Sequence, residues 1–579
     1  MEGAGEAQST KMRGYILGLT FTSIAGIILG WTAPLLELAN QGGNALASPL
    51  LYIAILLQLV GGILNFFALS YLRPAIVFPV YGSIQIFESV IVAQILLPAT
   101  NPWSNLFYAS LILIVVSLVL IAYSISRKPE EEVVDLLPPN PQVVTPDEIL
   151  NEGFADVFKL LDINLMGAYG RIKHRWAHSG KKYTHPNLVE SCYTSLVWKL
   201  WMPEIALEIL EPFFDAQTAD GQLPSKVKML GKEYREAVPI VAYCIAAQNP
   251  STELLERVYP KLKAFQGWLY QNRRNSEGFF FWKTPEESAM QGSSRFGNLS
   301  DISHVIPVDL NAYMVLQNKT LAQMAASLDL PEEVKILENQ ASDLTEKIQT
   351  KLWDAGLNMY YDWDSNKNEF IGIMSLTNFL PLTAQIPTEE QANALISHLT
   401  NAEMFNTLIP YPSVSISDEK HVTEKWNGAV SLSLAYLVLQ GLKFYQKDRV
   451  IAESTFKLIH GIFSHWKLDG SFYEFYSPNA LKYDLAAKPG KDFVGSTGLI
   501  NTLLVEEIIG LKITDTEIVI CPKLPPGWKT EVISYSIPTK NVALQMNFQE
   551  TDEIKIELTI DTRKEEFEIK NYEEKRIIL

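Results

Sequence analysis

Four long apolar stretches near the start of the chain limit its possible folds more than any other feature of the sequence. They run over residues 14–36, 49–71, 75–98 and 105–126. A helix of about 20 apolar residues is long enough to cross the ~30 Å hydrocarbon core of a bilayer. Residues 1–126 are therefore predicted to form a module of four transmembrane helices, with the lipid bilayer as a partner.

Basic residues beside these stretches predict the orientation of the module. The loops 37–48 and 99–104 carry no Lys or Arg, whereas the other flanks carry Lys11, Arg13, Arg73, Arg127 and Lys128. Positive residues stay on the cytoplasmic side. An integral, multi-pass membrane protein is therefore expected, with both termini and the large C-terminal domain in the cytoplasm.

One carboxylate lies in the middle of the third stretch. Tyr81, Gln85 and Glu88 recur at helical spacing and form a polar stripe. An acid inside a membrane helix is a functional hypothesis by default. The alternative is a helix–helix contact in which Gln58 or Asn65 satisfies Glu88.

The stretch ALSYLRPAIVFPVYGSIQIFES, which begins at Ala68, resembles the drug/metabolite transporter superfamily. The resemblance implies one four-helix repeat or one small multidrug-resistance subunit, and hence a homodimer through the membrane helices. The first helix of small multidrug-resistance proteins carries a Glu, but residues 14–36 contain no acid. A plain membrane anchor therefore stands beside the transporter hypothesis.

The rest of the chain predicts a mostly α-helical architecture. Residues 127–146 are charged and proline-rich, which is typical of a linker. Segments with apolar residues at i, i+3, i+4 and i+7 follow, and they predict about a dozen helices over 147–508. Helical pairs with long loops suit an α/α barrel. Alternating apolar residues with turn signals over 509–579 predict a small β-domain.

Composition excludes several function classes. The formal net charge is −17 and no basic stripe is present, which argues against a nucleic-acid partner. The three cysteines, Cys192, Cys244 and Cys521, are far apart and form no Cys-x-x-Cys motif. We therefore expect no metal site and no cofactor.

Four blocks of the C-terminal half resemble trehalase and its relatives in glycoside hydrolase family 63, including the mannosylglycerate hydrolases. The blocks are FFDAQTADGQLPSKV from Phe213, ESAMQGSSRF from Glu287 with IPVDLNAYMV, PSVSISDEKHVTEKWNGAVSLSLAYLVLQGLKFY from Pro412, and GSFYEFYSP from Gly470 with DFVGSTGLI. Their order and spacing match the family over most of 150–508. The resemblance implies an (α/α)6 toroid, preceded here by four transmembrane helices and followed by the small β-domain.

The resemblance also implies an inverting mechanism, in which one carboxylic acid protonates the leaving oxygen and a carboxylate activates water. Glu474 stands at the position of the catalytic base. Gln291 stands where the family has an Asp as the acid, and a carboxamide cannot donate that proton. Glu287 is the nearest fallback acid, and Glu286 and Asp301 are more remote ones.

The remaining site residues that the resemblance implies are ligand contacts. Glu190, Arg295, Trp426, Tyr473 and Tyr476 are predicted to bind substrate. Other family positions have changed: Asn427 replaces an Arg, and Ser431 and Ser496 replace aromatic residues. These losses indicate a degenerate active site.

Three hypotheses remain open at this point. The first is a membrane-anchored glycosidase acting on a small α-linked sugar, with Glu474 as the base and an unusual group, or a substrate carboxylate, as the acid. The second is a non-catalytic sugar-sensing or scaffold domain that regulates the membrane module. The third is a transporter that uses Glu88.

Overall fold

The computed structural model describes residues 137–180, 185–228, 238–480, 490–514, 516–528, 533–548 and 553–579, together with scattered residues between 20 and 64. The chain divides into two compact units, Met1–Leu136 and Leu137–Leu579. All of the described β-strands belong to the second unit.

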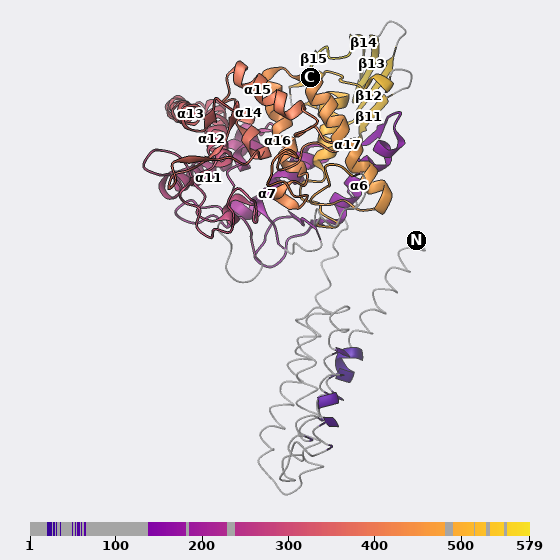
Figure 1. Ribbon diagram of the computed structural model, residues 1–579. Coiled ribbons are helices and arrows are strands. Elements are labelled where there is room, and N and C mark those ends of the chain that lie inside the picture. The colour runs from indigo at the N-terminus through magenta and orange to yellow at the C-terminus, as the bar shows by residue number, and fades with distance from the viewer. Residues whose placement is uncertain are drawn as a thin grey trace, which may run out of the picture. The chain divides into compact units, whose positions relative to one another are not determined.

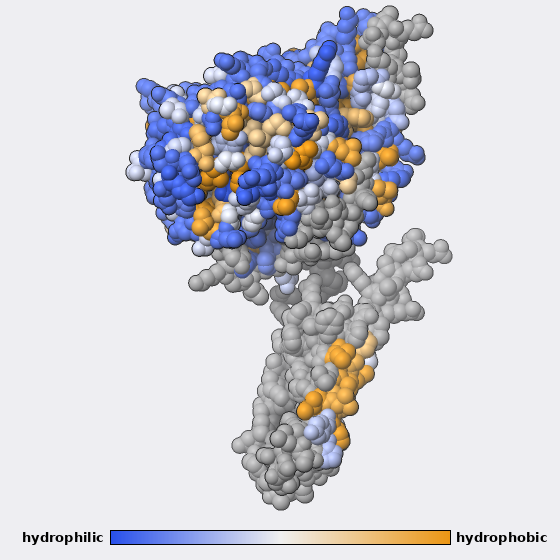
Figure 2. All heavy atoms as spheres, in the orientation of Figure 1, coloured by the Kyte–Doolittle hydropathy of each residue, from blue (hydrophilic) through white to orange (hydrophobic). Residues whose placement is uncertain are grey.

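In the first unit the described residues are mostly helical and mostly apolar, for example residues 55–57, and Figure 2 shows hydrophobic residues among them. No helix among the described residues is both long and apolar enough to cross a membrane. Most of the four predicted spans lies outside the described residues, and so do Tyr81, Gln85 and Glu88. The transmembrane module therefore remains a prediction from sequence.

The second unit is mostly helical (Figure 1). Its helices are α6 (Glu148–Ile163), α7 (Leu188–Trp201), α8 (Pro203–Glu208), α9 (Glu211–Asp215), α10 (Val241–Ala246), α11 (Thr252–Asn272), α12 (Val308–Ser327), α13 (Pro331–Lys351), α14 (Leu380–Thr383), α15 (Glu389–Thr400), α16 (Leu432–Leu442), α17 (Asp448–Asp469) and α18 (Leu499–Leu503). A π-helical turn, η7 (Leu504–Ile509), continues α18.

Inner and outer helices differ in their apolar pattern. Helix α12 is buried around most of its circumference. The neighbouring α13 buries only one stripe, formed by Leu337, Ala341, Leu344 and Ile348. A helix that is buried all round belongs in a core, whereas an amphipathic helix covers it. Figure 1 shows α11, α12 and α13 side by side at one end of the unit.

Local signals set where several helices begin and end. The Thr388 hydroxyl accepts a hydrogen bond from the Gln391 backbone N–H, and the Gln391 side chain in turn accepts one from the Thr388 N–H, so α15 begins with a capping box. Helix α17 ends at Gly470, whose φ is 69°. A left-handed residue at this position favours glycine.

The C-terminal β-structure forms two sheets. The larger has the order β1–β11–β12–β13–β14 and the smaller has the order β15–β10–β9, all antiparallel. Their strands are β1 (Gln142–Val144), β9 (Leu511–Ile513), β10 (Glu517–Ile520), β11 (Ile533–Ile537), β12 (Val542–Phe548), β13 (Glu553–Ile560), β14 (Arg563–Lys570) and β15 (Lys575–Ile578). The β-rich C-terminal region predicted from sequence is thus present.

The larger sheet packs on the helices through its alternating buried residues. Ile533, Tyr535 and Ile537 of β11 are buried. The Tyr535 ring meets Phe154 of α6 edge-on, with centroids 6.1 Å apart. Helices and sheet therefore share one apolar core.

Strand β1 changes the extent of the predicted linker. Residues 142–144 were predicted to belong to the linker 127–146, but they pair with β11 in the register Gln142↔Ser536 to Val144↔Ser534. The end of that segment is therefore part of the folded unit.

The smaller elements complete the unit and position several loops. They are β2 (Leu165–Met166), β3 (Trp176–Ala177), β4 (Val305–Ile306), β5 (Trp353–Asp354), β6 (Met359–Tyr360), β7 (Asp362–Asp364) and β8 (Glu369–Ile371), with the 3-10 turns η2 (Pro285–Ser288), η3 (Leu376–Phe379), η4 (Lys425–Asn427), η5 (Lys443–Tyr445), η8 (Pro526–Trp528) and η9 (Pro538–Lys540).

Candidate active site

A cavity of about 260 Å³ lies where several distant segments meet. We call it the glutamate cavity. Its lining includes Asn187, Val189, Glu190, Tyr193, Ser225, Lys226, Glu286, Glu287, Gln291, Lys425, Trp426, Ser431, Ser433, Glu474, Phe475, Phe493 and Ser496. Of the residues predicted from sequence, Glu190, Glu287, Gln291, Trp426 and Glu474 are therefore together.

Helix α7 presents Glu190 from its first turn. The Asn187 side chain caps the helix by accepting a hydrogen bond from the Val189 N–H at 3.2 Å. The Leu188 N–H donates to Ser225 O at 2.8 Å, and Asn187 pairs with Lys226 as an isolated β-bridge. The start of α7 thus brings Glu190 and Lys226 to the same cavity.

Glu190 is partly exposed as a residue, but its Oε2 atom is buried and has no hydrogen-bond partner among the described residues. Burial raises the pKa of Glu190 to about 7; a backbone hydrogen bond opposes the rise, the nearby charge of Glu474 adds to it and Lys226 again opposes it. At neutral pH this carboxyl is present in both protonation states, so it can donate as well as accept a hydrogen bond.

Gly495 is needed for this placement of Glu190. A Cβ atom on Gly495 would lie 2.5 Å from Glu190 Cγ, which is well inside van der Waals contact. The Thr194 hydroxyl of α7 donates to the Gly495 carbonyl at 2.8 Å and holds the two segments together. Any side chain at residue 495 would displace Glu190.

Glu474 lies on a segment held from both sides. Its N–H donates to Gly490 O at 3.0 Å, and Val430 and Tyr476 exchange backbone hydrogen bonds of 2.8 and 3.1 Å. These bonds fix the segment between the Trp426 loop and residues 490–493. The carboxylate therefore has a defined position in the cavity.

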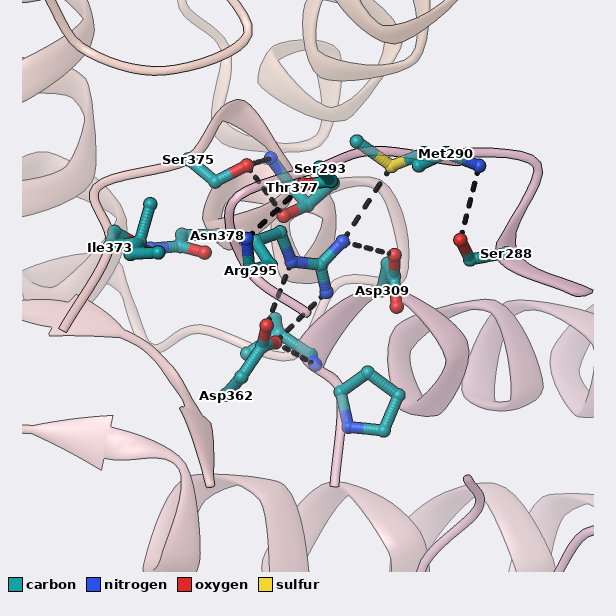
Figure 3. Close-up of polar contacts among 12 residues, drawn as sticks. Ser288, Met290, Ser293, Arg295, Asp309, Asp362, Ile373, Ser375, Thr377 and Asn378 are labelled. Atoms are coloured by element: carbon teal, nitrogen blue, oxygen red, sulfur yellow. Dashed lines mark hydrogen bonds and ion pairs between the residues drawn. The ribbon is translucent and has the colours of Figure 1, made fainter. Parts of the chain in front are cut away.

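Gln291 lies on a loop that is anchored at each end. On one side the Ser288 hydroxyl accepts from the Met290 N–H at 3.1 Å. On the other side Arg295 Nη1 approaches Met290 Sδ at 3.6 Å. Figure 3 shows Arg295 between Asp309 and Asp362, with Met290 beside it.

Arg295 does not line the cavity, which corrects its prediction as a substrate contact. Its side chain is only 1% exposed. Nη1 donates to Asp309 at 2.7 Å, while Nε and Nη2 donate to the two oxygens of Asp362 at 2.8 and 3.0 Å. The Val308 N–H also donates to Asp362 at 2.8 Å. Arg295 therefore anchors the Gln291 loop to the start of α12.

Asn427 connects the Gln291 loop to the Trp426 loop. Its Oδ1 accepts from the Ser294 N–H at 2.6 Å, and its Nδ2 donates to Gly292 O at 2.8 Å. The Asn that replaces the family's Arg is thus a bridge between the two loops.

Tyr473 and Tyr476 also differ from their prediction as substrate contacts. Both are buried and neither lines the cavity. The Tyr473 hydroxyl donates to Asp469 at 2.9 Å, and the Tyr476 hydroxyl accepts from the Tyr473 N–H at 3.0 Å. Phe475, between them, is the aromatic residue that faces the cavity, and its ring meets Trp426 edge-on at 4.8 Å.

Glu287 lines the cavity but is unsuited to the role of fallback acid. Its carboxylate accepts from Arg273 Nε at 2.8 Å and from the Lys283 N–H at 2.8 Å, and Arg273 Nη2 forms a second contact. The Arg273 guanidinium thus contacts both carboxylate oxygens. Glu287 is therefore a structural carboxylate that orders the turn η2.

The sequence reasoning also missed several residues of the lining. Lys226 and Lys425 supply positive charge, and Phe475 and Phe493 supply aromatic surface. Lys226 lies in the first block, two residues after the Asp-Gly-Gln-Leu-Pro turn, so its position in a matched motif was the available signal. Phe475 and Phe493 lie in the fourth block, so they carried the same signal.

The chain is similar in sequence to known glycoside hydrolases. A family model described as "Mannosylglycerate hydrolase MGH1-like glycoside hydrolase domain" matches residues 187–483, which is 297 of 579 residues. A mannosylglycerate hydrolase from Rubrobacter radiotolerans is 20% identical over 410 residues, covering 55% of this chain and 90% of that protein. An uncharacterized protein from Borreliella burgdorferi is 22% identical over 328 residues, covering 53% and 67%.

A solved GH63 mannosylglycerate hydrolase from Thermus thermophilus, in complex with Tris and D-glycerate, is similar in fold. Its TM-score is 0.52 at 21% identity, covering 60% of this chain and 99% of that chain. A sialidase structure gives a TM-score of 0.62 at 12% identity, covering 76% and 41%. The mostly helical, GH63-like fold predicted from sequence is thereby confirmed.

Proposed function

Since the chain belongs to the mannosylglycerate hydrolase MGH1-like glycoside hydrolase family, we propose that its helical domain binds a small α-linked glycoside in the glutamate cavity and hydrolyses it. The observation that carries the proposal is the pairing of Glu190 and Glu474 in one small cavity, with the pKa of Glu190 raised to about 7. An inverting glycosidase needs one carboxyl group protonated and the other ionised.

Each carboxyl group has a role in this proposal. Glu474 is the base that activates water. Glu190 is the proton donor, because Gln291, at the family's acid position, has no proton to give. A proton donor works best when its pKa lies near the operating pH, and Glu190 meets that condition.

Two cations favour a substrate with its own carboxylate. Lys226 and Lys425 line the same cavity as four glutamates, one of which, Glu287, is paired with Arg273. The Thermus relative was solved with D-glycerate, and the Rubrobacter relative is a mannosylglycerate hydrolase. We therefore place mannosylglycerate and glucosylglycerate ahead of the uncharged sugars trehalose and kojibiose.

A second candidate function is sugar binding without turnover, and Gln291 is the observation that favours it. This residue faces the cavity, and losing general-acid assistance typically costs about 10²- to 10⁴-fold in rate. In that case Glu190 binds a sugar hydroxyl group, and the domain acts as a sensor or scaffold.

Calorimetric titration of the full chain with the four sugars, followed for hours, separates these functions. Sustained heat that both Glu474→Gln and Glu190→Gln abolish supports hydrolysis with Glu190 as the donor. A saturable binding heat without turnover, together with turnover gained by Gln291→Asp, supports the binding function. If neither the wild type nor the Gln291→Asp protein binds any of the four sugars, both proposals fail.

The predicted membrane module is part of the proposal. The four apolar stretches and the distribution of Lys and Arg support attachment to a membrane with the helical domain on the cytoplasmic side, as a plain anchor, as a homodimer, or as a transporter that uses Glu88. Retention of the full chain in the membrane fraction after an alkaline carbonate wash is the expected result. Its release into the soluble fraction contradicts the proposal.

A further inference from the structure

A second, larger cavity of about 640 Å³ lies between the helices and the C-terminal sheets. We call it the lysine cavity. Its lining comes from the last turns of α7 and α16, the segment after α10, the π-turn η7 and strands β9 to β13. None of these residues lines the glutamate cavity.

Positive charge dominates the lining. It holds four lysines, Lys199, Lys443, Lys512 and Lys540, against two acidic side chains, Glu506 and Asp561, so the side chains of the lining have an excess of two positive charges. Lys199 pairs with Glu506 at 2.7 Å and Lys443 pairs with the buried Glu507 behind the wall. Lys512 is exposed and forms no ion pair with any described residue. Lys199 and Lys443 are thus neutralised by their partners, and the positive charge that an entering anion would meet is that of the exposed Lys512.

Three polar atoms in the lining are buried without a hydrogen-bond partner among the described residues. They are Gln248 Oε1, Gln440 Nε2 and the Tyr535 hydroxyl. Gln440 and Tyr535 are more than nine-tenths buried. A buried polar group without a partner destabilises a fold by about 1–3 kcal/mol, so an occupant that formed hydrogen bonds with these atoms would stabilise the fold.

Another part of the lining is apolar. Ile518, Ile537, Val542 and Ile560 project from β10 to β13, and the rings of Tyr243 and Tyr436 complete it. A hydrated inorganic ion gains nothing from such a wall, whereas an organic body buries apolar surface against it. The occupant that fits therefore combines a charged group with an apolar body.

We propose that the lysine cavity binds a small organic anion. Its apolar body lies against the residues of the β-strands, and Lys512 and Lys540 hold its charged group. Its polar groups form hydrogen bonds with Gln248, Gln440 and Tyr535. The π-turn η7 borders the cavity, since Glu506 lines it, whereas Glu507 of the same turn does not. Single π-turns occur frequently at functional sites. The site is separate from sugar binding.

Three matched probes test the proposal on the full chain. 1-Naphthyl phosphate has both parts, 1-naphthol has the body alone and inorganic phosphate has the charge alone. Isothermal titration is expected to give one saturable site for 1-naphthyl phosphate, at least about tenfold tighter than for either of the others. Equal affinities for the three probes, or no binding at millimolar concentration, would mean that the cavity holds only water, and the proposal fails.

Matched variants locate the site. Lys512→Gln is expected to weaken 1-naphthyl phosphate binding about fivefold, whereas Lys564→Gln, an exposed lysine on β14 outside the cavity, leaves it unchanged. Tyr535→Phe is expected to weaken binding about threefold without lowering thermal stability, because the ring remains and only the unpaired hydroxyl is lost. Glu474→Gln leaves binding unchanged, and a loss of binding there, or equal effects of Lys512→Gln and Lys564→Gln, overturns the assignment.

Discussion

The helices α7 and α16 each line both cavities, and the two cavities differ in how they set the charge of a buried carboxyl group. The first turns of both line the glutamate cavity, and their last turns line the lysine cavity. In the first cavity, burial raises the pKa of Glu190 to about 7. Behind the lining of the second, burial would also raise the pKa of Glu507, but Lys443, Lys512 and Lys523 lower it to about 2. Burial alone therefore does not decide the charge of a carboxyl group, since the lysines around it can reverse the effect.

The largest expected effect tests the lysine side of this comparison. Glu507→Gln removes the counter-charge of the buried Lys443 and Lys523 and is expected to lower the free energy of unfolding by about 3 to 5 kcal/mol. Urea denaturation of this variant, with the exposed Glu568→Gln as a control, measures the loss. A loss no greater than that of the control would show that the lysines do not depend on Glu507.

The two carboxyl groups also predict opposite responses to pH. The pKa of Glu190 is raised from 4.5 to about 7, so its ionised form opposes folding. The contribution of Glu190 to the stability of the fold is therefore fully present below about pH 4.5 and is lost as pH rises through about 7. A shift of about 2.5 units corresponds to about 3 kcal/mol. Glu507 behaves in the opposite sense, because its contribution is present above about pH 4.5 and is lost as pH falls through about 2.

Glu190→Gln is therefore expected to stabilise the domain by up to about 3 kcal/mol at pH 8 and to have little effect at pH 4.5. Thermal unfolding at both pH values gives the measurement. The matched control is Glu286→Gln, an exposed glutamate of the same cavity. A stabilisation that is the same at both pH values would contradict the raised pKa.

A smaller effect is expected from the bridge between the two loops of the glutamate cavity. Asn427→Ala removes the hydrogen bonds to Ser294 and Gly292 and should lower stability by about 1 to 2 kcal/mol. It should also weaken sugar binding several-fold, because Gln291 and Trp426 lose their fixed spacing. Asn427→Asp keeps the acceptor for Ser294, so its stability and sugar affinity should lie between those of the wild type and of Asn427→Ala. If neither change affects sugar affinity, the contacts of Asn427 do not contribute to sugar binding.

The smallest expected effect concerns independence of the two cavities. Glu190 and Lys199 are nine residues apart on α7, or about 13 Å along the helix axis. Lys512→Gln is therefore expected to change sugar affinity by less than about twofold. Calorimetric titration with the best-bound sugar measures this, and a larger change would mean that the shared helices couple the two cavities.

The sequence predicted more of the residues that line the glutamate cavity than of the residues that hold them in place. Gln291, Trp426 and Glu474 come from three of the four matched blocks and lie together with Glu190 in the cavity, because a motif that matches in order and spacing occupies the matching place in the fold. Arg295 lies in the same block as Gln291 but turns to Asp309 and Asp362. The direction of a side chain within a loop depends on partners from other segments, which no local pattern contains.

One further difference has the same origin. The lysine cavity was not anticipated, because its lysines come from helix ends and strands that are adjacent only in the folded chain. Residues with such separate origins form no motif in the sequence.

Strand β1 has a consequence for the solubility of the domain. The larger sheet has two edges: β14, with the charged sequence RKEEFEIK, and β1, which covers β11. Without β1, the uncharged strand ISYSI of β11 would expose its backbone as a template on which a second molecule could add a strand. A fragment that begins after residue 144 should therefore self-associate, whereas one that retains residues 137–144 keeps its own edge cover and should remain dispersed.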